Sequence, residues 1–248
     1  PAPGGVGGYG QSEDQVTYNM MNDAIGGHSM LDTAENVARK YEVSREEMHD
    51  IVLRRFEQYQ DALKDDHAFH KRYMTLPFST PKPNFKAEAC VLAGDEGVFH
   101  TTREGLAKLK PVREGGTVTF GSQTHPADGN VGVIVTTPEE ARTLSRDSAI
   151  RVRLRGFGQS RVELGYMPEA PIGAAKRALA QAGIRLNDVA AIKSHNPFAV
   201  NDIAFARETG ADLETMNNYG CSLIWGHPQG PTGLRSIVEL IEELALSG

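Results

Sequence analysis

The chain has 248 residues, of which 40% are hydrophobic and 23% are charged, a composition typical of a globular protein with ample material for a core. Its formal net charge of -6 and the lack of a dense basic run argue against nucleic-acid binding, because phosphate recognition needs concentrated Lys and Arg. Two cysteines and no long apolar run exclude a disulfide framework and predict no membrane span.

The opening tract, residues 1–10, is rich in glycine and proline and has no initiating Met. It also lacks the charged and then apolar order of a signal peptide. We therefore expect a cytoplasmic protein of which this chain is one piece.

The first half of the chain carries helical patterns. Asp32, with Glu35 three residues on, is expected to cap a first helix, and Ser44 with Glu47 a second. The second helix has an apolar stripe formed by Met48, Ile51, Val52, Phe56, Tyr59 and Leu63. Its opposite face is expected to be solvent-exposed and holds Arg54, Glu57, Gln58 and Asp61.

An irregular region follows the second helix. Prolines break the pattern over residues 77–85, which predicts a loop, and Thr101 with Glu104 is expected to cap a short helix. A boundary between two regions is predicted near residues 111–116.

The second half alternates β-rich runs with helical patterns. Strands are predicted over 117–120, 131–136, 150–157 and 189–193, and helices over 138–146, 168–181, 198–208 and 230–246. Gly183 fits a left-handed cap of the second of these helices. Such alternation predicts a sheet covered by helices, hence an α/β layered fold.

One candidate site surrounds His227. Glycines including Gly226 flank a strand-like apolar run, 223–225, and the following loop leads into a helix N-terminus. His227 could exchange a proton near neutral pH or donate a hydrogen bond to an oxyanion. A turn holding a half-buried structural histidine explains the same pattern.

A second candidate lies where a predicted strand meets a helix, at residues 194–198. His195 and Asn196 stand at such a strand end, where ligands gather in α/β sheets. A capping Asn before a proline in the first helical turn is the structural alternative. Cys221, although close to His227 in sequence, begins an apolar run and is predicted to be a packing residue.

In order along the chain, these segments resemble the thiolase family. The resemblance rests on Thr33-Ala-Glu-Asn-Val-Ala with Val43-Ser-Arg-Glu-Glu, Thr102-Arg-Glu-Gly-Leu-Ala-Lys-Leu-Lys-Pro, Gly116-Thr-Val-Thr-Phe-Gly-Ser with Asp128-Gly129, and Gly226-His-Pro-Gln-Gly-Pro-Thr-Gly-Leu-Arg. The motif of His195 and Phe198 is similar to the His-Asp-Cys-Phe variant of sterol-carrier-type thiolases, where many thiolases have Asn-Glu-Ala-Phe.

The resemblance implies an acyl-CoA C-acyltransferase with the layered α/β/α/β/α thiolase fold. His227 would activate a nucleophilic cysteine, and His195 would help to hold the thioester oxygen. Contacts to coenzyme A, a co-substrate, would come from Thr124, Asn196, Phe198 and Gly226. No metal or redox cofactor is expected.

Departures from the family pattern are also clear. Neither Cys90 nor Cys221 stands at the nucleophile's motif position, and the family's late Cys-x-Gly-Gly segment does not occur. In the stretch 121–126 the usual Asn-Ala-Ser-Gly is altered, and Cys221 replaces the second glycine of a Gly-Gly pair. We therefore expect a companion segment or subunit to carry the nucleophilic cysteine.

The resemblance also implies a division of the chain. Residues 1–115 are expected to form the loop domain that covers coenzyme A, residues 116–147 the return segment of the first core domain, and residues 148–248 the second core domain. A homo- or hetero-oligomer is expected.

Three alternatives remain at this point. The chain could belong to a non-catalytic acyl-CoA or lipid-binding relative, or to a condensing enzyme of the ketoacyl-synthase type, although the Gly-His-Pro loop and the long loop domain favour thiolase. A third alternative is a specialised bacterial thiolase for aromatic or branched acyl groups, acting with an OB-fold partner subunit.

Overall fold

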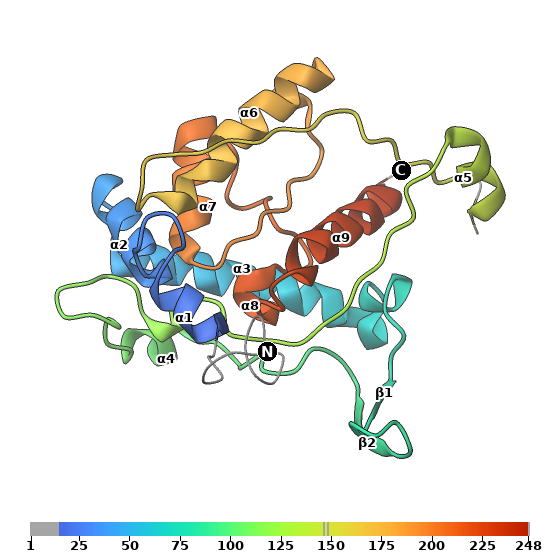
Figure 1. The fold of residues 1–248 in the computed structure, drawn as a ribbon, viewed down its shortest axis with the longest axis horizontal. Coiled ribbons are helices and arrows are strands. Elements are labelled where there is room, and N and C mark those ends of the chain that lie inside the picture. The colour runs from blue at the N-terminus through green and yellow to red at the C-terminus, as the bar shows by residue number, and fades with distance from the viewer. Residues whose placement is uncertain (1–14, 146, 148, 248) are drawn as a thin grey trace, which may run out of the picture.

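The computed structural model describes residues 15–145, 147 and 149–247 (Figure 1). Its helices are α1 (Gln15–Met21), α2 (Met30–Lys40), α3 (Arg45–His67), α4 (Arg103–Ala107), α5 (Pro138–Leu144), α6 (Ala170–Ala182), α7 (Ala199–Thr209), α8 (Ser222–Trp225) and α9 (Pro231–Ser247). Two strands, β1 (Phe78–Pro81) and β2 (Glu88–Leu92), pair antiparallel, with an irregular register between Thr80 and Pro81. Short 3-10 helices are η1 (His70–Arg72), η2 (Phe120–Ser122), η3 (Met167–Glu169) and η4 (Leu186–Asp188).

The long helices form the body of the molecule. α3 contacts α4, α7 and α8, while α6 packs against α7 (Figure 1). The β1–β2 hairpin projects away from this body, and α5 lies at its edge between two long extended stretches (Figure 1). The organisation brings α7 and α8, which carry the candidate site, directly onto α3.

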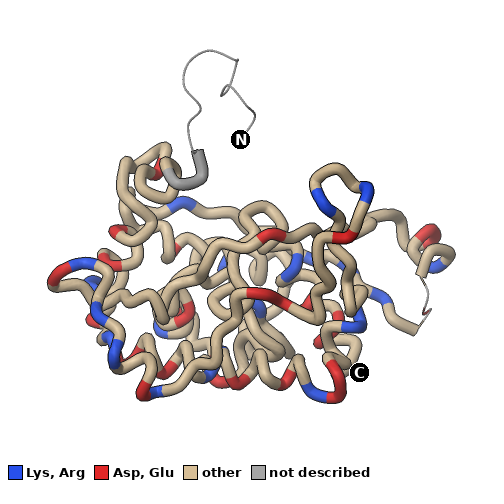
Figure 2. The backbone as a smooth tube through the Cα atoms, turned by 90° about the horizontal axis from the view of Figure 1, so that it is seen from below, with Lys and Arg blue, Asp and Glu red and all other residues tan. Residues whose placement is uncertain are grey.

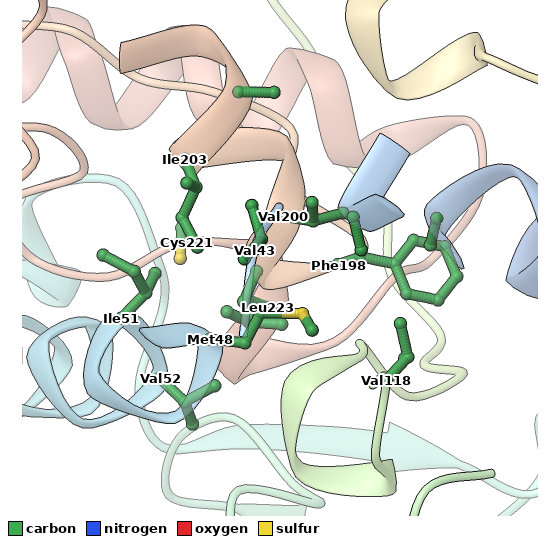
Figure 3. Packing of buried hydrophobic residues seen from close by; sticks show 14 of the residues in the cluster. Val43, Met48, Ile51, Val52, Val118, Phe198, Val200, Ile203, Cys221 and Leu223 are labelled. Atoms are coloured by element: carbon green, nitrogen blue, oxygen red, sulfur yellow. The ribbon is translucent and has the colours of Figure 1, made fainter. Parts of the chain in front are cut away.

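One apolar core joins these helices. Val37 of α2, Met48 of α3 and Val200 of α7 are each fully buried in it. Figure 3 shows Leu223 of α8 and Val118 in the same cluster, so the core draws on both sides of residues 111–116. Burial of this kind stabilises a fold by about 25 cal/mol for each Å² of apolar surface removed from water.

A buried ion pair lies beside this core. Arg55 of α3 donates from Nε to Oδ2 of Asp202 on α7 over 2.9 Å, and both side chains are 0% exposed. Arg55 also donates to the carbonyls of Leu213 and Met216. Asp202 accepts further hydrogen bonds from Ser194, Asn196 and Asn217. Because a buried charge without partners is very costly, this network fixes α3 against α7.

The helix predictions were largely confirmed. Ser44 is the N-cap of α3 and accepts from the N–H of Glu47 over 3.0 Å. The predicted helices over 138–146, 168–181, 198–208 and 230–246 correspond to α5, α6, α7 and α9, and Gly183 caps α6 with a φ of 68°.

Two caps and one residue of the exposed face of α3 were predicted wrongly, while Glu57 and Asp61 on that face are exposed as expected. Ser29, not Asp32, is the N-cap of α2, and Thr102, not Thr101, is the N-cap of α4. Glu35 instead accepts hydrogen bonds from the backbone of Thr117 and Val118. Gln58, expected on the exposed face of α3, is 1% exposed because it bonds the buried chain around residues 214–218.

The four predicted strands are not regular strands in the part of the chain that the structure describes. Residues 131–136, 150–157 and 189–193 lie in no strand ladder, since none has a neighbouring strand to complete its hydrogen bonds. Residues 117–120 form only an isolated antiparallel bridge, between Thr119 and Pro111. Segment 150–157 lies on α6 instead: the N–H of Phe157 donates to Gln181 over 2.6 Å. Conversely, the loop predicted over 77–85 contains β1 and the hairpin turn, whose exposed strand gave no alternating apolar signal.

Charges of both signs are interspersed over the surface. Figure 2 shows Lys and Arg interspersed with Asp and Glu along the backbone. Among the described residues, no helix combines the length and the apolar character that crossing a membrane requires.

The ion pair generates a test of stability. Asp202→Ala should lower the free energy of unfolding by roughly 3–5 kcal/mol, because it leaves the Arg55 guanidinium buried without its counter-charge. Urea denaturation monitored by circular dichroism measures the change. The matched control is Arg103→Ala, which removes an ion pair to Asp50 with side chains 68% and 57% exposed and should cost under about 1 kcal/mol. Equal effects of the two variants would show that the buried pair has no special role.

Candidate active site

The first wall of the site is the segment that enters α7. Residues 194–198 are fixed to α7, because Ser194 and Asn196 both donate hydrogen bonds to the carboxylate of Asp202. Asn196 is 0% exposed, and its Oδ1 accepts the N–H of Leu223 over 3.2 Å. These contacts fix the backbone on either side of His195.

The second wall is the turn that follows α8. Gly226 ends this helix with a φ of 96°, and a Cβ there would lie 2.8 Å from both Ala127 and the His125 ring. A residue with a side chain is therefore excluded by both backbone conformation and space. The N–H of His227 donates to the carbonyl of His125 over 2.8 Å, which sets the direction of the His227 side chain.

These walls bring two imidazoles together. The ring centroids of His195 and His227 are 4.4 Å apart, with an angle of 40° between the ring planes. Nδ1 of His195 lies 2.9 Å from Oγ of Ser222, and Nδ1 of His227 lies 2.6 Å from Oγ1 of Thr232. Neither Nε2 has a hydrogen-bond partner among the described residues, so both remain able to bond a reactant.

Burial keeps both rings neutral. The pKa of His195 is lowered from its ordinary 6.5 to about 4, first by burial and then by the neighbouring His227. Burial also lowers the pKa of His227. At pH 7 each ring therefore holds one proton, as a general base or a neutral hydrogen-bond donor requires.

The other predicted contact residues lie around this pair in different ways. Thr124 joins the two walls, since its N–H donates to the carbonyl of Pro197 and its hydroxyl to that of Ser222. Phe198 is 7% exposed and belongs to the core, as Figure 3 shows. Asn196 is wholly enclosed as well. Asn196 and Phe198 are therefore buried residues that support the segment carrying His195.

Neither described cysteine has the environment of a nucleophile. Cys221 is 1% exposed, and burial raises the pKa of its thiol to about 11, which confirms it as a packing residue. Cys90 lies exposed on β2, in the projecting hairpin. The run expected to be strand-like after Cys221 is the helix α8, whose residues are buried on all sides and so give no periodic signal.

A cavity of about 410 Å³ opens beside the second wall. It is lined by His125 and by Leu223 of α8, and by Phe99, Leu109 and Phe120 from the segments facing them. Phe99 and Phe120 are 79% and 71% exposed, so apolar rings border it on the solvent side. Nε2 of His125 is buried and has no hydrogen-bond partner among the described residues.

Trp225 of α8 anchors the turn that carries His227 to α9. It is 2% exposed, and the guanidinium of Arg235 lies 4.0 Å from its ring centroid. Arg235 in turn bonds Asp95 and Glu239. Burial by itself lowers the pKa of Arg235, but the hydrogen bond to Asp95 and the charges of Glu239 and Asp95 outweigh it and hold this pKa above the ordinary value. This stack fixes α8 to α9 and so holds the turn that carries His227.

Several of these residues gave no signal in the sequence. Ser222 lies inside an apolar run, and Arg55 and Asp202 lie in ordinary helical patterns far apart in sequence. Thr232 is the exception, because it lies only five residues after His227, in the loop that the sequence had indicated as part of the site. Only the packing of α3, α7 and α8 reveals their connection to the site.

The sequence and the fold both define the class of protein. Residues 7–139 match the thiolase N-terminal domain family and residues 148–248 the thiolase C-terminal domain family. The chain therefore belongs to the thiolase family, as its motifs predicted.

Individual relatives agree with this assignment. A probable acetyl-CoA acyltransferase of Staphylococcus aureus is 30% identical over 239 residues, which cover 96% of this chain and 59% of the relative. An acetyl-CoA acetyltransferase of Chromobacterium violaceum is also 30% identical, with coverage of 99% and 62%. The chain thus spans about three fifths of the length of these curated relatives.

Solved structures confirm the α/β thiolase fold. The acetyl-CoA acetyltransferase of Bacillus anthracis superposes with a TM-score of 0.84 at 28% identity, covering 97% of this chain and 59% of that one. Human mitochondrial 3-ketoacyl-CoA thiolase in complex with CoA gives a TM-score of 0.79 at 28% identity, with coverage of 95% and 57%.

The lowered pKa of His195 predicts a pH dependence of stability. Below pH 6.5 the unfolded ring takes a proton that the folded ring refuses until about pH 4, so the free energy of unfolding falls as pH falls through this window. His195→Asn should reduce that slope by at most about 1.4 kcal/mol per pH unit. Urea denaturation between pH 4 and pH 7 measures it, and an unchanged slope would contradict the lowered pKa.

Proposed function

We propose that this chain is part of a thiolase-type acyltransferase, which cleaves 3-ketoacyl-CoA with coenzyme A or condenses two acyl-CoA molecules. The observation that carries the proposal is the imidazole pair. Both rings are anchored through Nδ1 to a hydroxyl and present an unbonded Nε2 at one place. That arrangement supplies a base and an oxyanion donor side by side.

His227 acts as the base in this scheme. Its Nε2 takes the proton of a cysteine thiol, and the thiolate attacks the keto carbon of the substrate. The bond between this carbon and the α-carbon then breaks, the α-carbon takes the proton held by His227 as acetyl-CoA leaves, and the acyl group stays on sulfur. The thiol of a second coenzyme A gives its proton to His227 and attacks the acyl-enzyme. Acyl-CoA leaves, and the cysteine thiolate regains a proton from His227.

His195 serves the oxyanion that forms when the thiolate attacks. A neutral imidazole that donates from Nε2 can stabilise this charge without an ionic partner. The motif of His195 and Phe198 supports a sterol-carrier-type variant, which we include in the proposal. His195 then fills the position that many thiolases give to Asn.

The nucleophile comes from a segment outside this chain. Cys90 is exposed on the hairpin and Cys221 has a raised pKa, so neither suits the role. Because the relatives are longer than this chain, we place the reactive cysteine on a companion segment or subunit, in a homo- or hetero-oligomer. A reducing cytoplasm suits this chemistry, since a reactive thiolate is readily oxidised.

Coenzyme A is proposed to lie along the cavity beside α8. The human mitochondrial thiolase has been solved in complex with CoA, and the cavity here is lined by His125, whose carbonyl accepts the N–H of His227. Its apolar lining of Leu109, Phe120 and Leu223 suits a pantetheine arm, while the phosphates would remain in solvent near Phe99.

Loss of the base should abolish most turnover. In the assembled enzyme, His227→Ala should lower kcat for thiolysis by roughly a hundredfold or more, because general-base catalysis contributes about that much. Release of acetyl-CoA measures the rate. The control is His67→Asn, at the end of α3, where Asn tolerates the left-handed φ of 60°. Turnover close to wild type in His227→Ala would refute the proposed role.

The assembled enzyme also distinguishes an acyltransferase from a non-catalytic acyl-CoA-binding relative. Trapping with a 3-ketoacyl-CoA followed by intact-mass analysis should show an acyl group on a cysteine of the companion polypeptide. Its absence, with acyl-CoA binding retained, would identify a binding relative instead. Co-purification of an OB-fold subunit and preference for aromatic or branched acyl groups would identify the specialised bacterial form.

A charge at the cavity mouth should weaken binding of coenzyme A. Phe99→Glu places a carboxylate where the phosphates are proposed to lie, so KM for coenzyme A should rise severalfold at low salt with little change in kcat. The matched control is Phe85→Glu in the hairpin, since Phe85 is 82% and Phe99 79% exposed. An equal rise in both variants would place coenzyme A elsewhere.

A further inference from the structure

The Ser222 hydroxyl lies between the two walls of the site and has three neighbours. Its Oγ is 2.9 Å from Nδ1 of His195, and it accepts the N–H of Asn196 over 3.2 Å. Oδ1 of Asn196 also lies 3.2 Å away. Ser222 is 0% exposed, so these contacts are made without competition from bulk water.

The orientation of the Asn196 amide is fixed from the other side. Its Nδ2 donates to Oδ2 of Asp202 over 2.8 Å, and a reversed amide would place an oxygen against that carboxylate. Oδ1 must therefore face Ser222, where it already accepts the N–H of Leu223.

The single proton of Ser222 then has two possible acceptors. Nδ1 of His195 is nearer, at 2.9 Å rather than 3.2 Å, and has no other partner among the described residues. Oδ1 of Asn196 already accepts one hydrogen bond, from Leu223. Because an amide oxygen can accept two, a network in which the hydroxyl donates to Oδ1 and Nδ1–H donates to Oγ also pairs every atom. The shorter distance, 2.9 Å to Nδ1 against 3.2 Å to Oδ1, favours Nδ1 as the acceptor of the hydroxyl proton.

We propose that Ser222 is a positioning residue, which donates its hydroxyl hydrogen to Nδ1 of His195 and so holds the ring's own proton on Nε2. This inference deepens the proposed function, on which its catalytic meaning rests. With the proton on Nε2, His195 presents an N–H to the oxyanion; the other tautomer would present a lone pair and repel it.

Two further facts agree with a single neutral tautomer. Asp202, which orients the Asn196 side chain, is itself held by Arg55, and the backbone N–H of Asn196 donates to Ser222, so Asn196 links the ion pair to the hydroxyl beside the imidazole. In addition, the lowered pKa of His195 keeps the ring neutral at pH 7. One ring nitrogen of His195 therefore has no proton, and an unprotonated nitrogen is what the Ser222 hydroxyl needs as an acceptor.

Nuclear magnetic resonance of the full chain tests the tautomer directly. Long-range proton–nitrogen correlation of the 15N-labelled protein at pH 7 distinguishes protonation at Nδ1 from protonation at Nε2, and comparison with His195→Asn assigns the signals. We expect His195 to be protonated at Nε2, with Nδ1 at the shift of a hydrogen-bonded, unprotonated nitrogen. A proton on Nδ1 in the wild-type chain would overturn the proposal.

The variant Ser222→Ala tests the role of the hydroxyl. The Nδ1 signal should move toward that of an unprotonated nitrogen without a donor, whereas Ser160→Ala, which removes a hydroxyl bonded to the carbonyl of Ala170, should leave it in place. An unchanged Nδ1 signal in Ser222→Ala would also overturn the proposal. If Ser222→Ala does not fold, the tautomer measured in the wild-type chain still tests the proposal.

Kinetics of the assembled enzyme add a second readout. Ser222→Ala should lower kcat by about tenfold, with KM changed less than about twofold, because a poorly held donor weakens stabilisation of the transition state alone. A change confined to KM would contradict the role. Complete lack of thiolysis in the wild-type assembly would refute the proposed function, while the resonance measurements would still decide the tautomer.

Discussion

The buried ion pair of Arg55 and Asp202 is the constraint on which the site depends. It joins the middle of α3 to the first turn of α7, and neither charge is exposed to solvent. Charges in such a position are tolerated only when each has several partners. Two of the remaining partners of Asp202 are Ser194 and Asn196, which flank His195. The interaction that fixes the helices thereby also fixes the backbone of the candidate site.

Sequence patterns predicted the helices because most of them bury one face and expose another. α3 is one example, with Ser44 at its start and Met48, Ile51, Val52 and Tyr59 buried along it. Patterns failed where a segment has no such contrast. α8 is buried on all sides, and segments such as 150–157 are extended without a strand beside them. Regular hydrogen bonding is a property of pairs of segments, which a single run of residues does not reveal.

The same limit applies to the site. His195 and His227 were predicted from their turns and from resemblance, since both lie where the chain changes direction. Ser222 and Asp202 could not be predicted, because their roles arise only when α7 and α8 meet. Asn196 is wholly enclosed, and its amide is oriented by Asp202. Its polarity was evident from the sequence, but the direction in which its amide faces depends on packing; the contact with coenzyme A stays a prediction.

The stack of Trp225 and Arg235 gives the molecule a built-in optical reporter. The chain contains one tryptophan, and it lies two residues before His227, beneath a guanidinium 4.0 Å from its ring centroid. A cation in that position perturbs the excited indole, and because the chain has one tryptophan, its tryptophan emission comes from the helix that precedes the candidate site. Movement of α8 relative to α9 is thus visible in the intrinsic fluorescence of the unlabelled protein.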